Sequence, residues 1–401
     1  MKKIAIIGGG PAGLRAAEIL SGIPGIEVHL FDAKASVGRK FLVAGRGGLN
    51  LTHSEAPEQF VSRYSGPADL WGNILDGFSA SNLREWAKSL GHDTYIGTSG
   101  RIFPKSEYAA GLLRAWVKRL HEQNVHFHMS HSLRDMTQSS TQWTLVFQTA
   151  HDQEASYTFD AVCLALGGAS WPQTGSDGKW DTLLTGKGIK LTPFTAANCG
   201  WEVDWTKEIL PHIEGVPLKN IRVIVGHHQV SGELVVTRYG IEGGPLYALG
   251  RYLRVMKQPA INIDWKPTVN EKALTGKLGA VKNQDEIFDR AAKAWNLSIP
   301  CRHLMERAGA RKLTVHQLVN LLKNYRLILK GPRPIDEAIS TAGGIRWEEL
   351  TPALMLRKLP GVFAAGEMID WEAPTGGYLL QGSFATGTYA AKSMMTYLGI
   401  H

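Results

Sequence analysis

Three glycines near the start of the chain have the spacing of a diphosphate-binding turn. Gly8, Gly10 and Gly13 follow the apolar residues 4–7 and precede a helix-like stretch at 14–20. The first glycine permits a tight turn out of a strand, the second lets the backbone approach a pyrophosphate, and the third lets the helix lie close to the sheet. Free N–H groups at the helix N-terminus complement the phosphate charge. The stretch therefore predicts a strand, a turn and a helix that bind a dinucleotide.

An acidic residue ends the next predicted strand. Residues 28–31 are Val-His-Leu-Phe, and Asp32 follows them, about 20 residues after the third glycine. Its carboxylate would accept hydrogen bonds from an adenosine ribose and would disfavour a 2′-phosphate. This unit fits FAD and NAD equally, so the rest of the chain must distinguish them.

The composition is that of a globular protein with room for two or three domains. The chain has 401 residues, of which 44% are hydrophobic and 20% are charged. It has no run of 18 apolar residues, and a core strand that begins at residue 4 leaves no room for a signal peptide. We therefore expect no membrane association and a cytoplasmic location. The three cysteines lie far apart without a Cys-x-x-Cys pair, which argues against a disulfide framework, a zinc site and a redox dithiol.

The formal net charge of +8 would attract anions, including RNA. No run of five basic residues and no RNA-binding motif occurs in the chain. RNA is therefore an alternative partner, and a small-molecule substrate is the expected one.

Helix-like and strand-like stretches follow one another in the first half of the chain. Residues 108–123 have helical spacing, whereas 125–136 and 143–149 alternate like the strands of a hairpin or small meander. We interpret His126 and His128 as exposed strand positions and not as metal ligands.

Glycine-rich loops follow the predicted buried strands. The loop at 38–53 combines glycines with arginines and a lysine, which suits backbone that passes close to a polyanion or a flat ring. Residues 161–166 form another apolar strand that leads into Gly167 and Gly168. Because ligands bind at the carboxyl ends of the strands in a doubly wound sheet, we expect this second junction beside the first.

The C-terminal stretch favours FAD over NAD. Residues 359–365 form a predicted strand that leads into Gly366 and Glu367, and residues 375–377 (Thr-Gly-Gly) precede a helix of small residues. The N–H groups of such a turn can face the N1/O2 edge of an isoalloxazine, where negative charge develops when flavin is reduced. A nicotinamide dehydrogenase would instead need one glycine turn and a catalytic side chain in its second half.

The composition changes between 195 and 343, where short β-like segments precede helix-like residues at 270–325. We predict an α/β fold with a Rossmann-like FAD-binding domain, similar to that of glutathione reductase, formed by residues 1–194 and 344–401. The insert at 195–343 is predicted to be a substrate domain made of a β-barrel and a small helical lobe.

The chain resembles the BaiN/RdsA family of FAD-dependent oxidoreductases, which includes aminoacetone oxidase-like members. The matching pieces span the whole chain and are 8–13, 38–40, 50–52, 100–104, 166–178, 237–245, 341–344 and 365–381. The resemblance implies a two-part FAD domain and an insert that roofs the flavin. The family loop usually ends Gly-Arg-Cys-Asn, but residues 47–50 here are Gly-Gly-Leu-Asn, so Leu49 replaces a thiol that could donate a proton. Residues 242–244 (Glu-Gly-Gly) stand where the family tends to have Ser-Gly, which indicates a side branch.

The predicted FAD contacts are residues at these glycine turns and strand ends. They are Gly8, Gly10, Pro11, Ala12, Gly13, Asp32, Ala33, Lys34, Gly38, Arg39, Lys40, Gly45, Gly47, Asn50, Leu133, Ala165, Leu166, Gly167, Gly168, Gly366, Glu367, Asp370, Thr375, Gly376, Gly377, Tyr378 and Leu379.

Five side chains are predicted to line a substrate cavity between the flavin and the insert. They are Arg46, His53, Arg101, Tyr239 and Tyr378. The two arginines could bind a carboxylate or phosphate, or form structural ion pairs. His53 could move a proton, or it could lie at the surface or against an FAD phosphate. No side chain needs to be a nucleophile, because flavin N5 carries out the hydride chemistry.

These features predict an FAD-dependent oxidoreductase that transfers a hydride between flavin N5 and a small organic substrate. The chain has no second Gly-x-Gly-x-x-Gly between a strand and a helix, so either NAD(P)H reaches the flavin through the substrate cavity or oxygen reoxidises it. Two alternatives stay open. One is a flavin-dependent reductase of a uridine base in RNA, and the other is a non-enzymatic FAD-binding redox protein. The oligomeric state is also left open.

Overall fold

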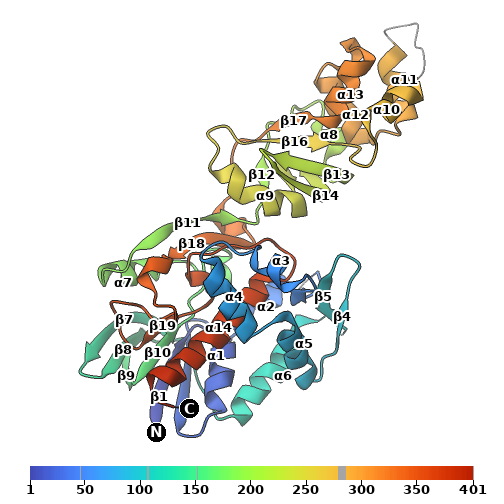
Figure 1. Cartoon of the computed structure of the whole chain (residues 1–401). Helices are drawn as coiled ribbons and strands as arrows, with labels where there is room; N and C mark the ends of the chain where they lie inside the picture. The colour runs from blue at the N-terminus through green and yellow to red at the C-terminus, as the bar shows by residue number, and fades with distance from the viewer. Residues whose placement is uncertain (46, 106–107, 151, 279–285, 401) are drawn as a thin grey trace. The chain divides into compact units, whose positions relative to one another are not determined.

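The computed structural model describes most of the chain and divides it into two compact units (Figure 1). The described residues are 1–45, 47–105, 108–150, 152–278 and 286–400. Met1–Thr195 and Ile339–His401 form the first unit, and Ala196–Ala338 form the second. The insert predicted from the sequence covers 195–343, whereas the second unit covers 196–338.

Two paired strands carry the chain out of the first unit and back into it. They are β11 (Leu191–Ala197) and β18 (Ser340–Ile345). Gly343 has a φ of +101°, and a Cβ there would lie 2.5 Å from the carbonyl oxygen of Pro193. Glycine is therefore required for this close approach of the two strands.

The core of the first unit is a parallel sheet with the strand order β19-β10-β1-β2-β6. Its strands are β1 (Lys2–Ile7), β2 (Ile26–Asp32), β6 (His126–Met129), β10 (Ala161–Leu164) and β19 (Val362–Ala364). Ile4, Ile6 and Leu164 are fully buried, as expected for strands covered on both faces. The predicted Rossmann-like fold is confirmed, and its sheet is assembled from both ends of the chain.

Helices and a β-meander cover opposite faces of this sheet (Figure 1). These elements are α1 (Pro11–Ser21), α14 (Tyr378–Tyr397), β7 (Ser132–Ser139), β8 (Gln142–Gln148) and β9 (Glu154–Phe159). The two helices pack so closely that a Cβ at Gly387 would lie 2.3 Å from the Ala12 carbonyl oxygen. On the other face, the ring of Phe31 stacks on that of Phe147 in the meander, with centroids 4.2 Å apart.

Six further α-helices and a small antiparallel sheet also belong to the described part of the first unit. They are α2 (Arg39–Ala44), α3 (Pro57–Val61), α4 (Ala68–Gly77), α5 (Ala80–Ser89), α6 (Ala109–Glu122), α7 (Asp181–Gly186), β3 (Thr52–His53), β4 (Thr94–Ile96) and β5 (Arg101–Pro104). The buried carboxylate of Glu18 joins α1 to α5 and α6. It accepts hydrogen bonds from the indole N–H groups of Trp86 (2.9 Å) and Trp116 (3.1 Å) and from Arg119 (3.0 Å). These donors offset the cost of burying the charge.

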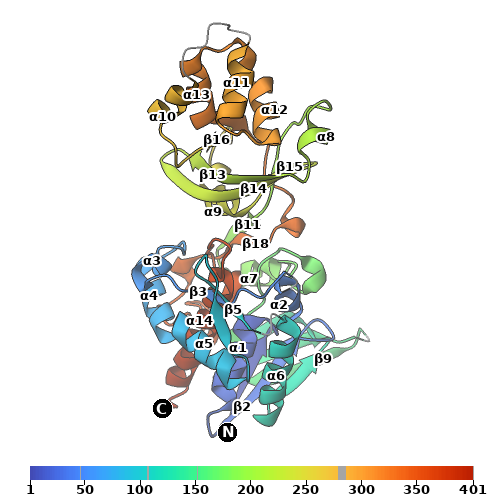
Figure 2. The ribbon, with the colours of Figure 1, turned by 90° about the vertical axis from the view of Figure 1, so that its right-hand side faces the viewer.

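The second unit is an antiparallel barrel with a helical lobe (Figure 2). Its strands, in their order round the sheet, are β12 (Trp201–Glu202), β15 (Gly240–Glu242), β14 (His228–Thr237), β13 (Pro217–Val225), β16 (Ala260–Asp264) and β17 (Tyr325–Ile328). Backbone hydrogen bonds of Glu202 with Gly331 and Lys330 (both 2.9 Å) close the sheet just after β17. The described α-helices are α8 (Leu210–Ile213), α9 (Gly244–Arg254), α10 (Glu271–Leu278), α11 (Ile287–Ala294), α12 (Ile299–Arg307) and α13 (Val315–Lys323).

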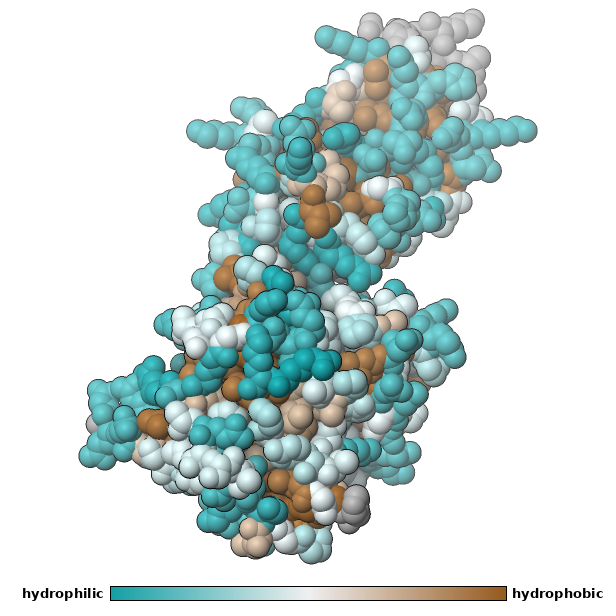
Figure 3. All heavy atoms as spheres, turned by 60° about the vertical axis from the view of Figure 1, so that its left-hand side comes forward, coloured by the Kyte–Doolittle hydropathy of each residue, from teal (hydrophilic) through white to brown (hydrophobic). Residues whose placement is uncertain are grey.

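The face of the molecule drawn in Figure 3 is mostly hydrophilic, with separate small hydrophobic areas. Exposed apolar side chains that are scattered in this way are normal for folded proteins. In the described residues, no helix combines the length and the apolar character that a membrane span requires.

Candidate functional site

A cavity of about 760 Å³ lies in the first unit at the carboxyl ends of β1, β2 and β10. Strand ends are where ligands bind in open parallel sheets. The predicted cofactor contacts that line it are Gly8, Gly10, Pro11, Ala12, Asp32, Ala33, Lys34, Gly38, Arg39, Lys40, Leu133, Ala165, Leu166, Gly167, Gly366 and Glu367. The tertiary structure therefore gathers residues from both glycine junctions and from the C-terminal strand around one space.

The three glycines of the first turn differ in the space that surrounds them. Gly8 has a φ of +112°, and a Cβ there would lie 2.2 Å from the carbonyl oxygen of Ala165. A Cβ at Gly13 would lie 1.9 Å from the Gly8 carbonyl oxygen, whereas a Cβ at Gly10 would meet no described atom within 4 Å. No described side chain caps α1, which begins at Pro11. The first N–H groups of this helix are therefore available to an anion in the cavity.

Asp32 ends β2 with its carboxylate held by the backbone. Oδ2 accepts a hydrogen bond from the N–H of Gly9 (2.9 Å), and Oδ1 accepts one from the N–H of Lys34 (2.8 Å). Burial raises the pKa of Asp32 above its ordinary value, and the two N–H donors oppose that rise. Each oxygen keeps a lone pair that can accept a ribose hydroxyl.

A charged network joins three segments at the cavity wall. The ammonium group of Lys40 donates to Ser170 Oγ (2.7 Å) and to Glu367 Oε2 (2.8 Å). Glu367 Oε1 accepts a hydrogen bond from the backbone N–H of Thr341 (2.9 Å). A Cβ at Gly168 would lie 2.0 Å from the Thr341 hydroxyl oxygen, so Gly168 packs behind this network.

Other predicted contacts lie outside the lining of this cavity. They are Gly13, Gly45, Gly47, Asn50, Gly168, Asp370, Thr375, Gly376, Gly377, Tyr378 and Leu379. Asp370 is directed towards β11, where its Oδ2 accepts a hydrogen bond from Thr192 (2.6 Å). Gly45 lies against α6, since a Cβ there would be 2.4 Å from the Cβ of Ala109.

The N-terminus of α14 lies against β3. Gly376 and Gly377 have φ values of +123° and +96°, and a Cβ at Gly377 would lie 2.5 Å from the Thr52 backbone. Three buried oxygens of this region have no hydrogen-bond partner among the described residues: Asn50 Oδ1, Thr52 Oγ1 and Gln381 Oε1. Unpaired buried polar atoms are rare in folded proteins, and none of these three residues lines the cavity.

Three of the predicted catalytic side chains come together in the first unit. β3 pairs with β5 so that His53 lies opposite Arg101, and the rings of His53 and Tyr378 stack with centroids 5.3 Å apart. The N–H of Glu55 donates to His53 Nδ1 (3.1 Å), and His53 Nε2 lies 3.0 Å from the carbonyl oxygen of Ser99. This arrangement fits the neutral Nε2–H tautomer, with both nitrogens engaged. Arg101 is exposed, and its guanidinium has no ion-pair partner in the described part of the chain.

An ion pair that the sequence analysis missed supports Tyr378. Glu55 accepts a hydrogen bond from Arg63 Nε at 2.9 Å. Burial, followed by the interaction with the Glu55 carboxylate, raises the pKa of Tyr378 above its ordinary value, so the phenol stays protonated. The hydroxyl of Tyr64 also donates to the Tyr378 carbonyl oxygen (2.7 Å). Opposite charges eight residues apart were the only sequence signal for this pair.

The other two predicted catalytic residues are placed differently. Arg46 lies outside the described residues. Tyr239 belongs to the second unit, where its hydroxyl donates to Glu242 Oε2 (2.6 Å) and the guanidinium of Arg333 lies 4.5 Å from the ring centroid. Burial, followed by the interaction with Glu242, raises the pKa of Tyr239 to about 12. Glu242 therefore fixes the Tyr239 hydroxyl as a hydrogen-bond donor.

Polar residues that were not predicted as individual contacts also line the cavity. They are Ser36, His131, Ser132, Arg134, Thr174, Ser176, Asp177, Lys179, Thr182 and Ser383. Most lie just before or at the start of β7 or in the segment after Gly168. Thr174, Ser176 and Asp177 fall within the stretch 166–178 that resembles the family. For the others, the only signal was that their segments follow strands of the same sheet.

The parallel sheet, its glycine turns and the cavity at the strand ends define a Rossmann-fold dinucleotide-binding protein. The chain belongs to the family of HI0933-like proteins, whose Rossmann-domain model matches residues 2–393. This confirms the BaiN/RdsA resemblance, and the family consists of FAD-dependent oxidoreductases.

The curated relatives are of nearly equal length and are named as two different enzymes. The 3-dehydro-bile acid delta(4,6)-reductase of Clostridium scindens is 28% identical over 98% of this chain and 99% of that protein. Ribosomal RNA dihydrouridine synthases of Escherichia coli and Haemophilus influenzae are 22% and 24% identical, and each alignment covers 97% of both proteins.

Two solved structures share the fold across the chain. The 3-ketosteroid-delta4-(5alpha)-dehydrogenase from Rhodococcus jostii matches with a TM-score of 0.52 and 14% identity, over 98% of this chain and 96% of that one. The 3-ketosteroid delta1-dehydrogenase from Sterolibacterium denitrificans matches with a TM-score of 0.53 and 11% identity, over 99% and 100%. At such identities the likeness shows the fold alone. Family membership makes the protein an FAD-dependent oxidoreductase.

Proposed function

We propose that this protein is a reductase of a small conjugated carbonyl compound, with NADH or NADPH as the electron donor. The observation that carries the proposal is the cluster of Arg101, His53 and Tyr378 beside the glycine turn of α14. The choice of substrate class is supported by the bile acid reductase, whose alignment covers almost the whole of both proteins. A 3-dehydro bile acid with double bonds at positions 4 and 6 is a conjugated ketone.

The cavity residues would hold and orient the cofactor. The first N–H groups of α1 would bind the diphosphate, and Asp32 would accept a hydrogen bond from the ribose. The N-terminus of α14, at Gly377, would stabilise negative charge on the pyrimidine edge of the flavin. Bound FAD supplies hydride transfer at its N5 atom.

Arg101 is the proposed substrate anchor. Its guanidinium has no ion-pair partner among the described residues, and its Nε would lie 3.7 Å from a Cβ at Gly376. A guanidinium binds a carboxylate or a carbonyl oxygen through charge-assisted hydrogen bonds. Tyr378, whose pKa is raised by burial and by Glu55, stays protonated and can orient a substrate oxygen as a donor.

Anaerobic stopped-flow absorbance tests this function. NADH or NADPH should bleach the flavin band at about 450 nm, and the conjugated 3-dehydro bile acid should restore it in the absence of oxygen. Arg101→Met should lower kcat/KM for the bile acid by about 10- to 150-fold, the effect of losing one charged hydrogen bond worth ~1.5–3 kcal/mol. Arg114→Met, which changes an exposed arginine of α6, is the matched control. The proposal is contradicted if oxygen reoxidises the reduced flavin but the bile acid does not.

Reduction of a uridine base in RNA is a second candidate. The net charge of +8 and the two relatives named as dihydrouridine synthases favour it. Leu49 disfavours it, because this fully buried side chain offers no proton where the family loop usually has cysteine. Formation of dihydrouridine in ribosomal RNA, with affinity that falls steeply as salt rises, would support this function over the first.

A further inference from the structure

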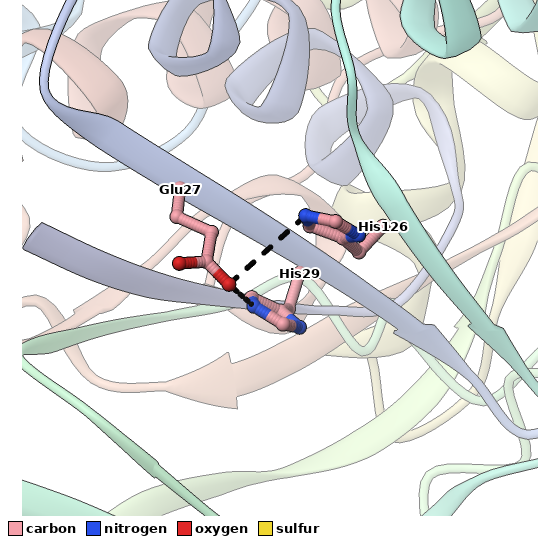
Figure 4. Close-up of side chains that lie close together, drawn as sticks. All are labelled: Glu27, His29 and His126. Atoms are coloured by element: carbon pink, nitrogen blue, oxygen red, sulfur yellow. Dashed lines mark hydrogen bonds and ion pairs between the residues drawn. The ribbon is translucent and has the colours of Figure 1, made fainter. Parts of the chain in front are cut away.

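Three potential metal ligands converge at the amino ends of β2 and β6 (Figure 4). They are Glu27, His29 and His126, and their ligand atoms all lie within 4.8 Å of one another. Side chains alternate along a strand, so Glu27 and His29 share one face of β2. The parallel register places His126 of β6 directly beside His29. The cluster therefore depends on a pairing of strands that are far apart in the sequence.

The geometry needs only small side-chain movements to hold an ion. His29 Nε2 lies 2.8 Å from Glu27 Oε1, and His126 Nε2 lies 4.0 Å from the same oxygen. The two imidazole rings stack with centroids 4.8 Å apart. Tetrahedral zinc, with bonds to nitrogen and oxygen of about 2.1 Å, needs ligand atoms about 3.4 Å apart. His126 is exposed, so its ring can move towards the other two ligands.

A second histidine can fix the orientation of His29. His29 Nδ1 lies 2.9 Å from Nε2 of His128, which occupies the same face of β6 as His126. When His29 Nδ1–H donates to His128, the lone pair of Nε2 is free for a metal, and outer hydrogen bonds of this kind orient ligating histidines.

We propose that Glu27, His29 and His126 bind one divalent transition-metal ion, for which zinc is the best match. Two imidazoles and one carboxylate form the ligand set of open zinc sites, with the fourth position left to water. Magnesium and calcium prefer oxygen ligands alone. The ion would join the edge strand β6 to β2. The site lies at the amino ends of the strands, whereas the cofactor cavity lies at their carboxyl ends, so it is independent of the proposed function.

One cation already competes for the carboxylate. Lys3 Nζ lies 3.6 Å from Glu27 Oε1, and the lysine side chain is about half exposed. Zinc must displace this ammonium group when it binds. Removal of the lysine charge should therefore strengthen zinc binding, whereas removal of a ligand should weaken it.

Isothermal titration of untagged, FAD-loaded protein with zinc chloride tests the proposal, with zinc content measured by mass spectrometry after dialysis. We expect one ion per chain, and His126→Asn should weaken its binding by at least about tenfold. Lys3→Gln should tighten it. His121→Asn, which changes an exposed histidine of α6, should leave it unchanged.

Folding of each variant is checked by its FAD absorbance and by thermal unfolding without zinc. The proposal is overturned if no stoichiometric binding occurs, or if the native protein and His126→Asn bind zinc equally. If His126→Asn does not fold, the Lys3→Gln arm decides: an affinity equal to that of the native protein overturns the proposal.

Discussion

Gly10→Ala separates cofactor binding from folding. Gly10 precedes α1 with φ −81° and ψ −179°, an extended conformation that alanine adopts freely. A Cβ there would meet no described atom within 4 Å, yet Gly10 lines the cavity. The added methyl group therefore projects into the space that the diphosphate would occupy, without disturbing the protein around it.

The expected magnitudes differ for the two properties. Alanine is a poorer N-cap than glycine, but it also restricts the unfolded chain, and these effects of opposite sign should leave the stability of the apoprotein within about 1 kcal/mol. A displaced diphosphate loses at least one charged hydrogen bond from α1, worth ~1.5–3 kcal/mol. The Kd for FAD should therefore rise by about 10- to 150-fold.

The assay is titration of the apoprotein with FAD by flavin fluorescence, together with urea unfolding in the absence of FAD. Gly13→Ala is the contrasting variant, because its Cβ would lie 1.9 Å from the Gly8 carbonyl oxygen and must disturb the turn. We expect Gly13→Ala to destabilise the apoprotein itself. The steric reasoning is refuted if Gly10→Ala binds FAD as the native protein does, or if it destabilises the apoprotein as much as Gly13→Ala.

Two further predictions follow from buried ionisable groups. Because burial raises the pKa of Asp32 above 3.8, the folded apoprotein binds this proton more tightly than the unfolded chain does. The stabilisation that protonated Asp32 contributes is present below pH 3.8 and is lost as the pH rises through the pKa of the folded state. Asp32→Asn should therefore flatten the pH dependence of the unfolding free energy in the acid range. An unchanged pH profile would contradict this prediction. Burial also raises the pKa of Cys163 to about 12 and that of Cys199 to about 11. Iodoacetamide at pH 8 should therefore label both thiols only after unfolding, as measured by mass spectrometry, and rapid labelling of the folded protein would show that these thiols are accessible.

The amino-acid sequence by itself determined the Rossmann-like fold class and the family. The apolar run at 4–7, the glycines of the first turn and Asp32 all lie within about 30 residues, and a strand–turn–helix–strand unit is specified by such local spacing. The C-terminal glycine turn at 376–377 was recognised for the same reason. Each of these features depends on backbone conformations that only the local residue types allow.

The tertiary structure decided which side chains meet. His53 reaches Arg101 only through the β3–β5 pairing, and Lys40 reaches Glu367 only because both ends of the chain enter one sheet. His126 is an ordinary strand position in the sequence, and the parallel pairing of β6 with β2 makes it a potential metal ligand beside His29. Such contacts depend on strand order and register, which follow from the packing of the whole core and leave no signature in the spacing of nearby residues.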